Sequence, residues 1–159
     1  MAINYRPLLG EIFLGMSVAN RERGEVSARE VALMYAQNAY DLGEEMGIAG
    51  LTVMGISTLA FTQLLLGRTD EAVRLSTRAV SFLRGGPLPN VRPEEVWFNH
   101  SLIMNKTGNR ADARSALERA YTLVVERASR IVDKELRRGF LRRVALNQRI
   151  LIAWKHLPK

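Results

Sequence analysis

The apolar residues of this chain recur every three or four positions along most of its length. This spacing places them on one side of an α-helix, whereas a half-buried strand alternates apolar and polar residues. No run of four or more residues alternates cleanly in this way. The pattern therefore predicts an all-α fold.

Glycines, prolines and capping signals divide the pattern into eight predicted helices. The first ends near Gly24, and a capping box formed by Ser27 and Glu30 starts the second, which runs to about Gly43. Two glycines and three prolines in segment 84–93 separate the fourth helix from the fifth. The third to eighth helices begin near residues 46, 69, 93, 109, 133 and 147. The apolar stripe of the first helix consists of Leu9, Ile12, Phe13, Met16 and Ala19.

Side chains that can cap a helix precede three more of these helices. Thr69 starts the fourth, followed by the acidic Asp70 and Glu71; Asn109 with Asp112 starts the sixth, and Asp133 the seventh. These local signals set the expected helix boundaries.

A run of 22 residues without a charged side chain, 46–67, has the length of a membrane span. It leads directly into the loop GRTDEA, however, and Arg68 is its only basic flank, so the signals that orient a membrane helix are weak. A helix buried on several sides within a stack is also apolar nearly all round. We interpret the run as the buried middle of a helical stack and predict no membrane insertion.

Two segments of the chain repeat at an offset of 41 residues, 66–80 and 107–121. The matching pairs are Gly67 with Gly108, Glu71 with Asp112, Ala72 with Ala113, Arg78 with Arg119, and Ala79 with Ala120. A weaker third copy places Ala32 and Ala39 at the alanine positions. Glycine reverses the chain and alanines let helices lie close together, so the repeat predicts stacked helical hairpins.

This pattern resembles the tetratricopeptide repeat (TPR) family over roughly residues 8–128. In the better copy the aromatic, small, glycine and alanine positions are Trp97, Ser101, Gly108, Ala113 and Ala120; in the other, Ile56 and Ala60 precede Gly67, Ala72 and Ala79. The period of 41 differs from the 34 residues typical of the family. The resemblance implies a right-handed superhelical stack of about three antiparallel hairpins, near residues 5–43, 47–84 and 93–129. With C-terminal helices near 133–157, they form a single TPR-like domain, residues 1–159.

The tail, residues 131–154, resembles the carboxyl-terminal end of helical repeat regions found in large bacterial signalling ATPases, nucleotide cyclases and transcriptional activators. This second resemblance implies a role in bacterial signalling or transcription regulation. The chain has no cysteine, and MAINYRPLLG lacks a signal-peptide pattern, so we expect a reducing, cytoplasmic location.

Catalytic chemistry is not expected of this sequence. The two histidines, His100 and His156, do not have metal-ligand spacing, and no nucleophile elbow, phosphate loop or paired-carboxylate arrangement is present. We interpret His100 as a packed, hydrogen-bonded side chain. The sequence therefore predicts no enzyme activity, cofactor or metal site.

The TPR resemblance implies a concave surface lined by the first helix of each hairpin. The residues expected to bind a protein or peptide there are Ser57, Phe61, Leu64, Leu65, Phe98, Asn99, Leu102 and Lys106. Phe98 follows Trp97 and must point differently, so we expect it to be an exposed anchor. Phe61 and Leu102 favour an apolar peptide or helix as ligand. Alternatively, these residues pack against neighbouring repeats or a dimer mate.

All of the excess positive charge lies in the last third of the chain: residues 105–159 carry 14 basic and 5 acidic side chains, and the whole chain has net charge +7. If residues 127–142 were one continuous helix, most of their basic residues would share a face, flanked by Arg137 and Arg143, that could dock an acidic partner, nucleic acid or an anionic membrane surface. A solvated outer face is the alternative. The basic patch consists of Arg127, Arg130, Lys134, Arg137, Arg138, Arg142 and Arg143.

These observations predict a non-catalytic, TPR-like scaffold or regulatory module that binds a protein or peptide. The alternative is a nucleic-acid- or ligand-responsive regulator that uses the basic C-terminal helices. A third alternative is self-association into a homo-oligomer, because an open stack leaves apolar ends uncovered.

Overall fold

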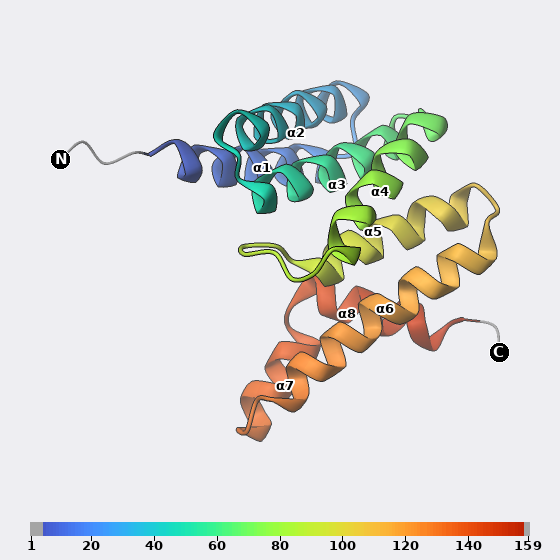
Figure 1. Cartoon of the computed structure of the whole chain (residues 1–159). Helices are drawn as coiled ribbons and strands as arrows, with labels where there is room; N and C mark the ends of the chain where they lie inside the picture. The colour runs from blue at the N-terminus through green and yellow to red at the C-terminus, as the bar shows by residue number, and fades with distance from the viewer. Residues whose placement is uncertain (1–4, 158–159) are drawn as a thin grey trace. The chain divides into compact units, whose positions relative to one another are not determined.

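The computed structural model describes residues 5–157, which contain eight α-helices and no strand (Figure 1). The predicted all-α fold is confirmed. The helices divide into two compact units, one ending at Arg92 and one beginning at Pro93, and each is described by itself. The single domain predicted for residues 1–159 stays a prediction, and residues 1–4 and 158–159 lie outside the described part.

The first unit consists of two helical hairpins in sequence. Its helices are α1 (Arg6–Glu22), α2 (Val26–Met46), α3 (Ala49–Leu65) and α4 (Thr69–Arg84). Each helix packs against the next along the chain, and α1 also contacts α3. Short loops join them, so neighbours run antiparallel (Figure 1).

The α3 helix is surrounded by the rest of its unit. Every residue from 50 to 60 is buried. The hydroxyl groups of Thr58 and Thr62 donate to the carbonyl groups of Met54 and Thr58, each at 2.8 Å, so the buried hydroxyls are satisfied within the helix. The interpretation of the charge-free run as a buried helix is confirmed, and none of the helices described in residues 5–157 has the length and apolarity needed to cross a membrane.

Glycines allow the first three helices to approach closely. A β-carbon at Gly55 would lie 2.7 Å from Cα of Tyr40, and one at Gly43 would lie 2.6 Å from the backbone nitrogen of Thr52. The prediction that α2 ends at Gly43 is therefore wrong. That glycine is a packing position, and the helix continues to Met46 before Gly47, with φ 64°, ends it in the left-handed conformation.

The second unit is organised around its longest helix, α6. Its helices are α5 (Pro93–Lys106), α6 (Arg110–Ser129), α7 (Lys134–Arg142) and α8 (Ala145–Lys155), and α6 contacts the other three. One buried core cluster of this unit consists of Phe98, Leu117, Ala120, Val124 and Ile150. At its edge the rings of Tyr121 and Trp154 stack with centroids 4.9 Å apart.

Two of the four predicted caps form. Asn109 accepts a hydrogen bond from the backbone nitrogen of Asp112 at 3.3 Å, and Asp133 accepts one from that of Leu136 at 2.7 Å. Ser27 and Thr69 do not cap, because each already lies in the first turn of its helix. The alanines of the repeat, Ala72, Ala79, Ala113 and Ala120, are all buried, as are Ala32 and Ala39 of the weaker copy.

Candidate functional site

The apolar stripe of α1 faces outward rather than into the core. Leu9, Ile12, Met16 and Ala19 are exposed, and Phe13 is half-buried. The residues buried on this helix are instead Gly10, Leu14, Ser17 and Arg21. The stripe is on one side of the helix, as its spacing predicts, but this side is not the one that packs against the rest of the unit.

Close packing explains why α1 buries its small and polar side. The hydroxyl of Ser17 donates to the carbonyl of Ala32 in α2 at 2.7 Å, and Gly10 lies directly against Leu51 in α3. The guanidinium of Arg21 lies 4.8 Å from the centroid of the Phe61 ring. Side chains as large as those of the stripe would hold α1 farther from both neighbours.

The outward stripe is part of a larger apolar surface on the first hairpin. The rings of Phe13 and Tyr35, with centroids 6.0 Å apart, connect α1 to α2 at its edge. We define the α1–α2 apolar face by its large exposed side chains, which are 40–64% accessible: Tyr5, Leu8, Leu9, Ile12, Met16, Val31 and Met34. Soluble proteins expose contiguous apolar patches chiefly at interaction sites. This face is the strongest candidate site in the first unit.

An ion pair borders the α1–α2 apolar face at one end. Nη2 of Arg6 in α1 lies 2.6 Å from Oε2 of Glu45 in α2. The hydrogen bond and then the charge of Arg6 lower the pKa of the Glu45 carboxyl. Both side chains are exposed, so solvent and salt weaken the pair. It bridges the start of α1 to the last turn of α2 without adding net charge to the face.

The predicted binding residues of α3 are largely covered. Ser57 is buried, whereas Phe61, Leu64 and Leu65 are half-buried. Nη1 of Arg29 donates to the carbonyl of Leu65 at 3.0 Å. These side chains present less surface than the α1–α2 apolar face does.

Two of the four predicted binding residues of α5 are buried. Phe98 is 3% exposed and Asn99 6% exposed, Leu102 is half-buried, and Lys106 is exposed. The expectation that Phe98 is an exposed anchor is wrong, because Ile150 of α8 packs in the same core cluster. The guanidinium of Arg149 also lies 5.4 Å from the centroid of its ring.

The predicted basic patch does not lie on one helical face. Helix α6 ends at Ser129 and α7 begins at Lys134, so the continuous helix that a shared basic face requires is absent. Several of its members have local partners: Arg127 pairs with the buried Glu94 at 2.6 Å, Arg138 with Glu135 at 3.4 Å, and Arg137 donates to the carbonyl of Ile131 at 2.9 Å. The exposed remainder consists of Arg130, Lys134, Arg142 and Arg143.

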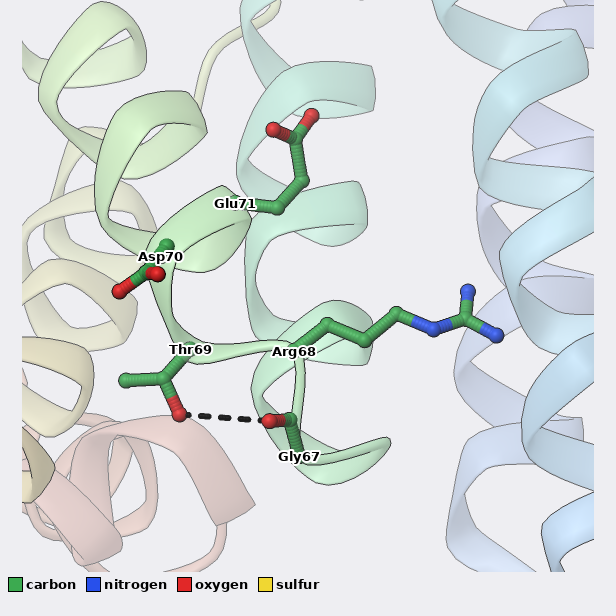
Figure 2. Close-up of a pocket in the computed structure, with 5 residues that line it drawn as sticks. All are labelled: Gly67, Arg68, Thr69, Asp70 and Glu71. Carbon is green, nitrogen blue, oxygen red and sulfur yellow. Dashed lines mark hydrogen bonds between the residues drawn. The ribbon is translucent and has the colours of Figure 1, made fainter.

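An open hollow of about 370 Å³ lies at the loop between α3 and α4 (Figure 2). It is lined by Gly67, Arg68, Thr69, Asp70 and Glu71. Figure 2 shows that the charged side chains point in different directions rather than converging on a common point. Arg68 reaches Glu30 at 2.6 Å, and Glu71 pairs with Arg74. The hollow therefore lacks the converging polar groups of a small-molecule site.

Residues 5–157 contain no group of three or more His, Asp or Glu side chains that could hold a metal ion. His100 is buried and its ring meets that of Trp97 edge to face, with centroids 6.4 Å apart. This agrees with the interpretation of His100 as a packed side chain.

No protein-family model matches this chain, and neither a curated protein nor a solved structure is similar enough to match it. The TPR resemblance accordingly rests on the repeated positions of the sequence.

Proposed function

We propose that this chain is a non-catalytic, TPR-like helical-repeat module that binds another protein through the α1–α2 apolar face. The observation that carries the proposal is the exposure of large apolar side chains at positions 8, 9, 12 and 16 of a helix whose opposite side packs against its unit. Apolar surface is unfavourable in water, so the free energy falls when a partner covers the face.

The repeat supports the TPR-like part of the proposal. Within each of three pairs, α1 with α2, α3 with α4, and α5 with α6, the two helices pack against each other, as successive helical hairpins require. The alanines at the repeated positions are buried where small residues are needed. A right-handed superhelical stack and a cytoplasmic role in bacterial signalling or transcription regulation belong to the same proposal, through the two resemblances.

Capture experiments test this function. We expect the tagged full chain to retain a specific protein that Ile12→Glu binds at least about tenfold more weakly, because a carboxylate at the centre of the face must be desolvated on binding. The measurement is quantitative mass spectrometry of the captured proteins.

Val132→Glu is the matched control, since Val132 is 91% exposed and lies outside the face. It should capture the same proteins as the wild type. Circular dichroism should show unchanged helix content in both variants, because both sites are exposed. Equal capture by wild type and Ile12→Glu would exclude the face as the binding surface.

The basic side of α7 favours nucleic acid as a second candidate partner. Lys134, Arg138 and Arg142 are spaced by four residues on this exposed helix, and Arg143 follows. We expect mobility shifts with DNA or RNA at low salt that weaken steeply as salt rises, and that Arg142→Glu with Arg143→Glu removes. Arg84→Glu, also at an exposed arginine, is the control. No shift at low salt would dismiss this candidate.

A further inference from the structure

We propose that the partner covering the α1–α2 apolar face is a second copy of this chain, with α1 packed antiparallel against α1 of its mate about a twofold axis. This inference rests on the proposed function, because it names the protein that the face binds. Closed twofold dimers use one surface patch on both subunits, so the patch must be complementary to itself.

The size of the face fits such a dimer. At their exposed fractions, the seven side chains that define it present roughly 650 Å² of surface, whereas a standard interface takes about 800 Å² from each partner. The largest apolar patch of an ordinary monomer is only about 300–600 Å². The exposed side chains of Arg6 and Glu45 at the border of the face add polar area to it.

The charge distribution also fits a second copy. None of the residues that define the face is charged, and residues 1–92 carry nine basic and nine acidic side chains. Two such surfaces meet without repulsion between like charges. A strongly acidic or basic partner gains nothing from this neutral surface.

The outward side of α1 has the shape that close helix pairing needs. Gly15 lies there, and a β-carbon at this position would meet no atom within 4 Å. A glycine inside a helix destabilises that helix, and here no contact within the chain requires the absence of a side chain. Together with Ala19, one turn further along, it leaves room for another helix.

An antiparallel pairing of two α1 helices matches their side chains in order. When Ile12 meets the partner's Met16, Leu9 meets the partner's Ala19 and Tyr5 meets the partner's Arg23. The first two contacts are apolar, and the third brings a guanidinium to an aromatic ring. Each contact occurs twice because of the symmetry.

The mass of the full chain in solution tests the dimer. Interfaces of this size bind with micromolar or tighter Kd, so light scattering after gel filtration at about 100 µM should resolve it. We expect twice the chain mass of 17.9 kDa for the wild type. A wild type of single-chain mass would overturn the proposal.

Charge variants test the pairing of the helices. Ile12→Glu and Met16→Lys should each be monomeric, because each variant places two unmatched charges in its own dimer. An equal mixture of the two variants should again form dimers, since the introduced carboxylate and ammonium then face each other. A mixture that stays monomeric would overturn the antiparallel register.

Val132→Glu is the control and should remain dimeric, and helix content should be equal in all variants. A dimer that Ile12→Glu leaves intact would overturn the proposal. Failure of the dimer is distinguishable from failure of the proposed function. A monomeric wild type that still captures a protein through Ile12 would overturn the dimer but leave the α1–α2 apolar face as a protein-binding surface.

Discussion

Replacing Phe98 by alanine is expected to lower the free energy of unfolding of the second unit by about 3–5 kcal/mol. The ring is 3% exposed and forms one core cluster with Leu117 of α6 and Ile150 of α8. Truncation leaves a cavity where these helices meet. Because both tryptophans of the chain, Trp97 and Trp154, belong to this unit, urea unfolding followed by tryptophan fluorescence measures the change.

Ile152→Ala provides the control for Phe98→Ala. Ile152 also lies on α8 but is 50% exposed, so its truncation should cost less than about 1 kcal/mol. If Phe98→Ala cost no more than Ile152→Ala, the packing of α8 against Phe98 would be incorrect.

Gly55→Ala is expected to destabilise the first unit by about 1–3 kcal/mol, because the added methyl group overlaps the backbone of Tyr40 and pushes α2 and α3 apart. Hydrogen exchange of the α2 and α3 amides, together with urea unfolding followed by circular dichroism, measures the loss.

Gly139→Ala is the matched control, since Gly139 lies within α7 and a β-carbon there meets nothing within 4 Å. It should stabilise its helix by up to about 1 kcal/mol, as alanine does in place of a helical glycine that has free space beside it. If Gly55→Ala also stabilised the protein, the close approach of α2 and α3 would be ruled out.

Local chemistry made most helix boundaries predictable. Asn109 and Asp133 cap the helices they were expected to cap, and Pro93 opens α5. The end of α2 was not predictable in this way, because Gly43 looks the same in the sequence whether it stops a helix or admits a neighbour. Only the position of Thr52 beside it decides between the two.

The candidate site was harder to predict than the fold. Periodicity correctly grouped Leu9, Ile12 and Met16 on one side of α1. It does not state which side of the helix packs against the rest of the unit. The opposite side, with Gly10 and Ser17, is the one that fits against α2 and α3. The same limit applies to Phe98, whose burial depends on α8, an element far away in the sequence.

Helix α1 buries few apolar side chains, and this affects how the region can evolve. Leu14 is the one large apolar side chain in the buried class on α1, with Phe13 and Val18 half-buried, so the helix adds little hydrophobic stabilisation to its unit. Segments attached this lightly open locally while the remainder stays folded. Substitutions on the exposed side of α1 can therefore change the binding partner during evolution, while the rest of the unit stays folded.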